Sequence, residues 1–175
     1  MFKTSQNAIN LLKEFEGCSS KVKGQNVRLS QKDIACNIKV YPYFCSANHL
    51  TIGFGNRVID DKKNLIYETN FLDGINVSEC EKMFAERIAN EDEESINRWL
   101  KVEVNQNQFD ALVCLHYNRP IWAKKIIDSI INIGEKDNSK KIENMWTNFA
   151  TIKGVINQGL LNRRHKELVL YFKIC

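Results

Sequence analysis

The sequence predicts an α+β fold in which one N-terminal helix leads into a small β-rich lobe and then into a larger helical lobe. Apolar residues recur with helical spacing in residues 5–16 and again from Val77 onward. Residues 18 to about 65 lose that spacing and gain β-branched and aromatic residues, interrupted by Gly, Ser, Asn and Pro. With 175 residues, 43% of them hydrophobic, we expect one domain over 1–175, with the first helix at 1–16, the β-rich lobe at 17–65 and the helical lobe at 66–175.

Local signals set the expected helix ends. Ser5 is the expected N-cap of the first helix, which ends at Glu16 because Gly17 follows. A helix near Val77 is expected to start at a capping box of Ser78 and Glu81 and to break near residue 90.

The remaining helices have similar signals. Asn105 and Gln108 form a second expected capping box, and Pro120 suits the first turn of a helix that stops at Gly134. Ser139 is the expected cap of the next helix, and a last helix covers about 161–172.

Composition excludes several classes of protein. The net charge of +4 is spread along the chain without a block of like charges, so nucleic-acid binding is not expected. No apolar run approaches the length of a membrane span, and residues 1–15 lack the apolar core of a secretory signal. We expect a monomer that is made in the cytoplasm and does not insert into membranes.

Six cysteines, at positions 18, 36, 45, 80, 114 and 175, form no CxxC pair and no metal-ligand spacing with the three histidines. No metal and no cofactor is therefore expected. Cys80 and Cys114 lie on apolar helix faces and are interpreted as core thiols. Cys18, Cys36 and Cys45 gather in one region, where their redox state could matter.

Glu16 is the first candidate for chemistry. A carboxylate in the last turn of a helix meets the negative end of the helix dipole, which favours its protonated form. Glycoside hydrolysis needs such a proton donor on one side of the bond and a group that activates water or attacks the sugar on the other. The β-rich lobe, with Cys45 and Thr51, could supply that second wall, although an exposed surface glutamate fits the same pattern.

Several ordered stretches resemble a known family. LLKEFEG (11–17) and CSANHLTIGFGN (45–56) resemble the phage-type lysozymes of glycoside hydrolase family 24, endolysins that cut peptidoglycan. NVSECEKMF (76–84), VEVNQNQFDALVCLHYN (102–118) and GLLNRRHKELVLYF (159–172) match in the family's order. The resemblance implies a lysozyme-like fold with a cleft between two lobes and hydrolysis of the β-1,4 bond between N-acetylmuramic acid and N-acetylglucosamine.

The resemblance also implies roles for single residues. Glu16 matches the general acid, Cys45 the position held by aspartate or cysteine, and Thr51 the threonine that helps to place or activate the water. Asn118 takes the place of a polar substrate-contacting residue, and Arg163 or Arg164 would hold a carboxylate, with that of Glu16 as one candidate.

Cys45 leaves alternatives open. An ordinary thiol is mostly neutral at pH 7, so it acts as a base or nucleophile only where its surroundings favour the thiolate. Cys45 could instead be a buried thiol or pair with Cys18 or Cys36 in a disulfide that silences the enzyme. Asp33 is a spare carboxylate, and the histidines at 49 and 116 are expected to be a loop residue and a satisfied helix residue.

The chain departs from the family between its first two candidates. The family usually has eight residues there, whereas this chain has 28, so we expect an insertion at about 19–39 that loops out to gate the cleft, bind wall or decorate the surface. Residues 118–120, NRP, replace a more usual NVG-like turn.

Two other functions remain compatible with the sequence: a lytic transglycosylase that uses Glu16 alone, and an inactive peptidoglycan-binding module. In each case the expected partner is bacterial peptidoglycan, reached in the wall or periplasm after release.

Overall fold

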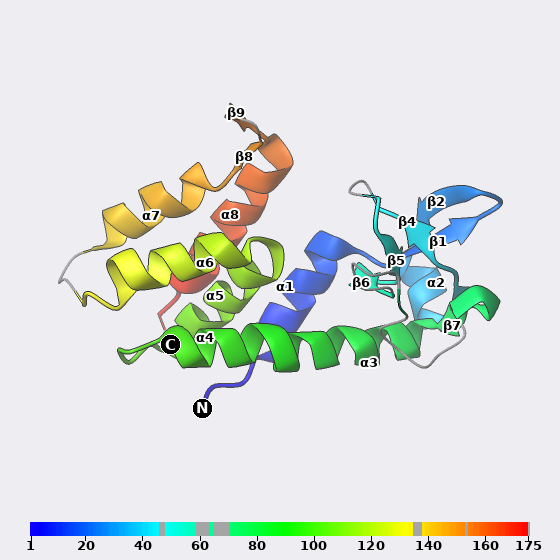
Figure 1. Cartoon of the computed structure of the whole chain (residues 1–175), viewed down its shortest axis with the longest axis horizontal. Coiled ribbons are helices and arrows are strands. Elements are labelled where there is room, and N and C mark those ends of the chain that lie inside the picture. The colour runs from blue at the N-terminus through cyan, green and yellow to red at the C-terminus, as the bar shows by residue number, and fades with distance from the viewer. Residues whose placement is uncertain (46–47, 59–63, 65–70, 135–137, 153, 175) are drawn as a thin grey trace. The chain divides into compact units, whose positions relative to one another are not determined.

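A computed structural model of the chain describes residues 1–45, 48–58, 64, 71–134, 138–152 and 154–174. The chain divides into two compact units, one formed by residues 12–87 and the other by residues 1–11 and 88–175. Helices alternate with small antiparallel sheets, so the predicted α+β class is confirmed (Figure 1). The organisation of the whole chain as a single domain stays a prediction.

The unit of residues 12–87 contains all but two of the short strands described. Its elements are the end of α1 (Gln6–Glu16), β1 (Ser19–Val22), β2 (Gln25–Arg28), α2 (Gln31–Ala35), β3 (Lys39–Val40), β4 (Tyr43–Phe44), β5 (Leu50–Ile52), β6 (Asn56–Arg57), a 3-10 turn (Phe71–Asp73), β7 (Ile75–Asn76) and α3 (Val77–Arg87).

Three of these strands form a meander that carries two predicted site residues at or beside its strands. β4 pairs with β5 so that Tyr43 faces Thr51 and Phe44 faces Leu50, and β5 pairs with β6. The core beneath them is apolar, with Leu12, Ile52 and Phe54 almost completely buried. The meander therefore forms a fixed frame for the residues between 43 and 57.

The expected insertion at 19–39 folds into regular structure. β1 and β2 form a hairpin, and α2 follows it (Figure 1). Ser30 and Asp33 form a complete capping box at the start of α2, so the spare carboxylate of Asp33 has a structural partner. These hydrogen bonds from Ser30 lower the pKa of Asp33.

The predicted capping box of Ser78 and Glu81 is wrong. α3 begins one residue earlier, and the Asn76 N–H donates to the Glu79 carboxylate at 2.8 Å. Glu81 instead pairs with Lys13 at 2.6 Å, within the same unit. This contact, together with the hydrogen bond from Asn56 to the Cys80 carbonyl, explains why α3 belongs with the strands in the unit that ends at residue 87.

The second unit is helical. Its further elements are a π-helical stretch (Ile88–Glu93), α4 (Glu94–Trp99), α5 (Gln106–Asn118), α6 (Pro120–Ile126), a second π-helical stretch (Ile127–Ile131), α7 (Ser139–Asn148), β8 (Thr151–Ile152), β9 (Val155–Ile156) and α8 (Gln158–Tyr171). The helix expected to break near residue 90 widens into the first π-helical stretch instead. No helix among the described residues is long and apolar enough to cross a membrane.

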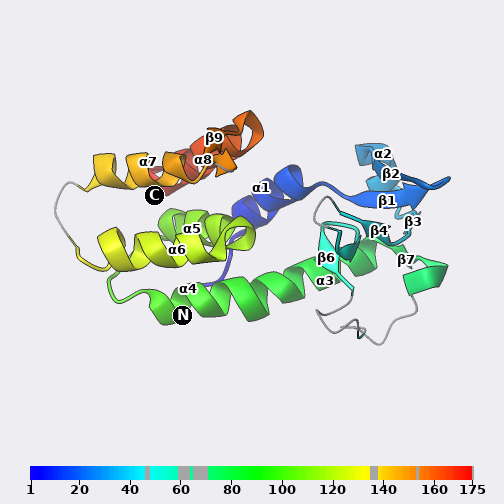
Figure 2. The same cartoon turned by 45° about the horizontal axis from the view of Figure 1, so that its top comes forward.

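α5 is the central helix of this unit and is buried from Phe109 to Tyr117. It packs against α6 and α8, which lie beside it in both views (Figure 2). Its polar side chains have partners: Asp110 accepts from the Ser5 N–H at 3.0 Å, and His116 Nδ1 lies 2.5 Å from Asp92 Oδ1. The interpretation of His116 as a satisfied helix residue is therefore confirmed.

The other helix ends agree in part with prediction. The box of Asn105 and Gln108 and the first-turn position of Pro120 are confirmed. The cap at Ser139 is wrong, because Asn138 precedes the helix and makes no side-chain cap bond. α8 starts about three residues earlier than expected, since the Asn157 side chain accepts from the Leu160 N–H at 2.9 Å.

A buried glutamate fixes the N-terminal residues to this unit. Glu93 accepts from the Thr4 N–H at 2.8 Å and pairs with Lys3 at 3.2 Å. Burial acts to raise the pKa of Glu93, but the hydrogen bonds from Thr4 and the Lys3 ammonium together outweigh it and leave that pKa below its usual value.

Candidate active site

Glu16 lies at the last residue of α1, as predicted, and is half-buried. Gly17 ends the helix with φ +64°, a left-handed conformation that glycine adopts without strain, and its N–H bonds to the Lys13 carbonyl. The Glu16 carboxylate lies close to Gly55: a Cβ built on Gly55 would stand 3.7 Å from Glu16 Oε2. The helix end therefore places this carboxylate beside the turn between β5 and β6.

Thr51 lies in the middle of β5 and is only 3% exposed. Its hydroxyl donates to the Tyr43 carbonyl across the strand pair at 3.1 Å. The hydroxyl proton is thus already used, but the oxygen can still accept a hydrogen bond from water.

Cys45 follows β4 at the start of a tight connection. Its N–H donates to the His49 carbonyl at 3.0 Å, and its own carbonyl accepts from the Asn48 N–H at 2.8 Å. Residues 46–47 lie outside the described ones. The Cys45 side chain is half-buried, so the thiol is neither a core residue nor fully open to solvent.

The described cysteines are all free thiols, and they differ in burial. Cys18, Cys80 and Cys114 are completely buried, which confirms Cys80 and Cys114 as core thiols. Burial raises the pKa of Cys18 to about 11 and raises the pKa of Cys80 further. Cys36 is exposed.

The three other predicted site residues lie in the helical unit, where they form one network. Arg164 Nη2 donates to Asn118 Oδ1 at 3.0 Å and to Glu167 Oε1 at 2.8 Å. Arg163 Nε donates to the same Glu167 oxygen at 3.1 Å. Both arginines hold a carboxylate, as expected, but in these contacts it belongs to Glu167; a pairing of either with Glu16 stays a prediction.

This network is buried. Arg164 and Glu167 are completely inaccessible and Arg163 is 7% exposed, so neither guanidinium is an open substrate-binding group. Burial lowers the pKa of Arg164 to about 10. Burial likewise raises the pKa of Glu167, while its two arginine neighbours act in the opposite direction.

Sequence reasoning missed Glu167 and Tyr43. Glu167 lies three and four residues after the two arginines, the spacing at which helical side chains meet, so the pattern RRHKE was a usable signal. Tyr43 is placed opposite Thr51 only by the strand register. Burial raises the pKa of Tyr43, and interactions with the side chains of Thr51 and Ser19 act against that rise, so these groups lie together.

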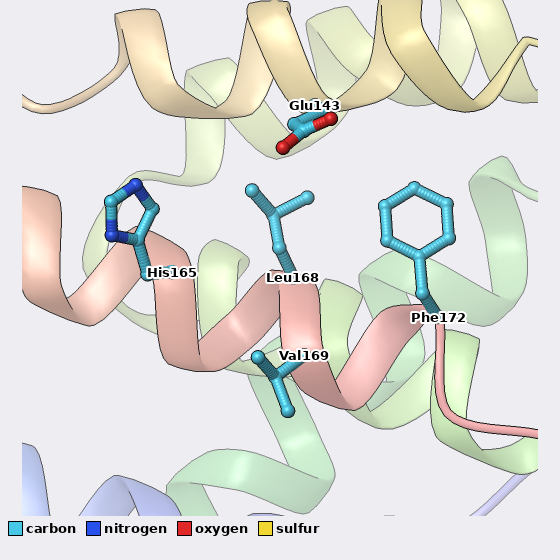
Figure 3. A pocket seen from close by; sticks show the side chains of 5 residues that line it. All are labelled: Glu143, His165, Leu168, Val169 and Phe172. Carbon is cyan, nitrogen blue, oxygen red and sulfur yellow. The ribbon is translucent and has the colours of Figure 1, made fainter.

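A separate pocket lies between α7 and α8. It has a volume of about 360 Å³ and is lined by Glu143, His165, Leu168, Val169 and Phe172. Figure 3 shows Glu143 on α7 pointing toward the α8 side chains. Within the described ranges, no group of three His, Cys, Asp or Glu side chains is arranged to hold a metal ion.

Comparison with known proteins gives consistent matches. The family model described as phage lysozyme matches residues 36–167. An endolysin of Bacillus phage PZA is 28% identical over 167 residues, which are 95% of this chain and 54% of that protein. The chain thus spans about half the length of the curated relatives it matches.

Solved structures agree on the fold. An endolysin from Escherichia coli O157:H7 phage FAHEc1 is 25% identical with a TM-score of 0.68, covering 98% of this chain and 94% of that one. A P22 lysozyme mutant is 22% identical with a TM-score of 0.67, covering 99% and 100%. The lysozyme-like fold expected from the sequence is confirmed. Cys45, Thr51, Asn118 and both arginines fall within the family match, whereas Glu16 precedes it.

Proposed function

Because the chain belongs to the phage lysozyme family, we propose that it is an endolysin-type muramidase, a glycoside hydrolase that cleaves the β-1,4 bond between N-acetylmuramic acid and N-acetylglucosamine in bacterial peptidoglycan. The observation that carries this proposal is the position of Glu16. Its half-buried carboxyl lies beside Gly55, in the same compact unit as Cys45 and Thr51.

Glu16 acts as the general acid. In its protonated form it donates to the oxygen that links the two sugars while the bond to the anomeric carbon breaks, and solvent protonates it again after each turnover.

Cys45 and Thr51 place the attacking water. The Thr51 oxygen accepts a hydrogen bond from this water, because its own proton is donated to the Tyr43 carbonyl. The Cys45 sulfur is a second, weaker acceptor, and as a thiolate it could also take the water's proton. Water that attacks from the face opposite Glu16 inverts the anomeric carbon.

The helical unit contributes a polar substrate contact. Asn118 is the residue we propose for this role, and the hydrogen bond from Arg164 fixes the orientation of its amide. Arg163 and Arg164 act indirectly, through Glu167 and Asn118, since both guanidinium groups are buried. The substrate is the wall polymer, which the protein reaches after release from the cytoplasm.

The test uses purified peptidoglycan and measures both the loss of turbidity and the release of reducing ends. Glu16→Gln should lower the rate by at least about 100-fold, because the amide cannot donate the proton. Cys45→Asp should remain active and Cys45→Ala should be weak. Glu86→Gln, at an exposed position of α3, is the matched control and should keep full activity.

Two outcomes would contradict the proposal. Products that end in an anhydro-muramyl ring rather than a new reducing end would indicate a lytic transglycosylase. A wild type that releases no fragments with or without reductant would indicate a binding module. Wild-type activity that appears only with reductant, together with Cys45→Asp activity that does not need it, would show that oxidation of Cys45 controls the enzyme. Equal wild-type activity in both conditions would rule that control out.

A further inference from the structure

The strand-containing unit has a pocket of its own that the proposed reaction does not use. It has a volume of about 400 Å³ and is lined by Lys21, Tyr41, Pro42, Phe44 and Leu50. Lys21 belongs to β1 of the expected insertion, and Phe44 and Leu50 form a facing pair of β4 and β5. We call it the hairpin pocket.

Two aromatic rings of the hairpin pocket are open to solvent. Tyr41 is 41% exposed and Phe44 is 53% exposed. The Tyr41 ring lies directly against Gly74, where an added Cβ would stand 2.8 Å from the ring. The Tyr41 N–H donates to Ser20 Oγ at 2.9 Å, and its carbonyl accepts from the Lys21 N–H at 3.2 Å. The ring is therefore held in place before any ligand arrives.

The strand register separates this pocket from the proposed catalytic residues. Successive side chains of a strand point to opposite faces of the sheet. The pair of Phe44 and Leu50 is next to the pair of Tyr43 and Thr51, so the two pairs lie on opposite faces. A molecule in the hairpin pocket would leave the face of Thr51 free for the reaction.

The charge of the surrounding segment favours an anion. Six Lys and Arg residues lie between positions 17 and 58, against one acidic residue, Asp33, so the rest of the chain has almost no net charge. Asp33 is itself bound by Ser30 in the capping box of α2. Among the residues that the structure describes, no side chain pairs with the Lys21 ammonium, which is exposed.

We propose that the hairpin pocket is an accessory binding site for peptidoglycan, with the rings of Tyr41 and Phe44 against a sugar ring and Lys21 paired with a carboxylate of the stem peptide. This inference rests on the proposed function. The C–H face of a pyranose ring is apolar and fits an exposed aromatic ring, whereas the stem peptide carries the anionic groups of the polymer. A second contact on the same chain of sugars raises the local concentration of cleavable bonds.

Binding is measured by sedimentation with insoluble peptidoglycan freed of teichoic acid, with Glu16→Gln in every protein so that the polymer stays intact. A second series uses the same peptidoglycan after a carbodiimide has coupled its carboxylates to glycinamide as neutral amides, which leaves the polymer insoluble. Lys21→Gln should weaken binding to untreated peptidoglycan by about two- to fivefold and have no effect on binding to the amidated polymer. Phe44→Ser should weaken both by about three- to tenfold.

Lys32→Gln removes an equal charge from α2, outside the hairpin pocket, and Phe172→Ser removes a similarly exposed ring from the other unit. Both should bind like the parent, and all variants should melt at the same temperature. If Lys21→Gln and Phe44→Ser also bind like the parent, the site is refuted. An equal loss for Lys21→Gln on the amidated polymer would refute the carboxylate contact.

The proposed function is tested separately in the same experiment, by the reducing ends that the protein with Glu16 intact releases. A protein that needs Lys21 and Phe44 for binding but releases no ends would refute the hydrolase and support the accessory site. A protein that releases reducing ends and binds equally well without Lys21 and Phe44 would support the hydrolase and refute the accessory site.

Discussion

Replacing the buried Glu167 by glutamine should destabilise the helical unit strongly. The Glu167 carboxylate accepts from Arg163 Nε at 3.1 Å, Arg164 Nη2 at 2.8 Å and Trp146 Nε1 at 2.8 Å, and it is completely inaccessible. Glutamine has nearly the same shape, so no cavity forms. The change removes the one negative charge that neutralises two buried guanidinium groups in these contacts.

The expected cost follows from that geometry. Breaking a buried ion pair by removing one partner costs about 3–5 kcal/mol, because the remaining charge is left uncompensated. We expect a cost at the lower end of this range, about 3 kcal/mol, because the glutamine oxygen still accepts hydrogen bonds. In a chain of this size, each kcal/mol lowers the melting temperature by about 2–4 °C, so the expected shift is about 6–12 °C.

Thermal unfolding followed by circular dichroism measures this shift. Glu143→Gln is the control, because it makes the same change at an exposed position of α7. Trp146→Phe removes only one of the three donors and should fall between the two. A melting temperature for Glu167→Gln within about 2 °C of the control would show that the buried guanidinium groups do not need this charge.

Two further predictions concern pH and backbone conformation. Glu93 has a lowered native pKa, so it stabilises the fold above about pH 4.5 and this contribution is lost as the pH falls through the native pKa. Glu93→Gln should therefore lower the free energy of unfolding by roughly 1–2 kcal/mol at pH 7 and by almost nothing at pH 2, measured by urea titration; an equal loss at both would contradict the pKa argument. Gly55 and Gly24 have φ of +81° and +82°, so alanine should cost each about 1–2 kcal/mol. The methyl group added at position 55 would reach the proposed catalytic carboxyl, whereas nothing lies within 4 Å of the methyl group added at position 24. Gly55→Ala should therefore also lower peptidoglycan cleavage, by about threefold or more, and Gly24→Ala should not. Equal cleavage rates for the two variants would refute that contact.

Sequence reasoning succeeded where the deciding signal is local. The end of α1 at Glu16 depends on Gly17, and the start of α5 depends on Asn105 and Gln108, so a few neighbouring residues were enough. The candidate positions of Cys45 and Thr51 came from a resemblance, and both lie within the residues that the family model matches. Their catalytic roles stay predictions.

Sequence reasoning failed where distant residues compete. Two overlapping capping boxes are possible at the start of α3, and Glu81 fits one of them by spacing alone. Glu81 pairs with Lys13, 68 positions away in the sequence, and so does not cap the helix. The partner of Arg164 was missed for the opposite reason: Glu167 is near in sequence, but the resemblance drew attention to Glu16 instead.

The fold of the insertion was hidden because its hairpin strands, β1 and β2, have no buried apolar face. β2 is exposed at every residue, so there is no alternation of apolar and polar side chains to detect. The hairpin is instead set by its two-residue turn, in which Lys23 and Gly24 both have positive φ. That geometry suits a tight hairpin, but lysine at the first position is a weak signal compared with asparagine or aspartate.

The geometry at the two ends of the insertion explains how twenty extra residues fit between an acid and its partner residues. The Ser19 N–H bonds to the Gly53 carbonyl at 2.9 Å, which ties the chain after Glu16 directly to the end of β5. The chain then leaves at Ser20 and returns at Tyr41, whose N–H donates to the Ser20 hydroxyl. Since departure and return are adjacent, the insertion closes on itself, and the entropic cost of a longer closed loop grows only slowly with its length. The distance from Glu16 to the meander is therefore set by the bond from Ser19 to Gly53, and the added residues can evolve a surface of their own, the hairpin pocket, at the point where they rejoin the fold.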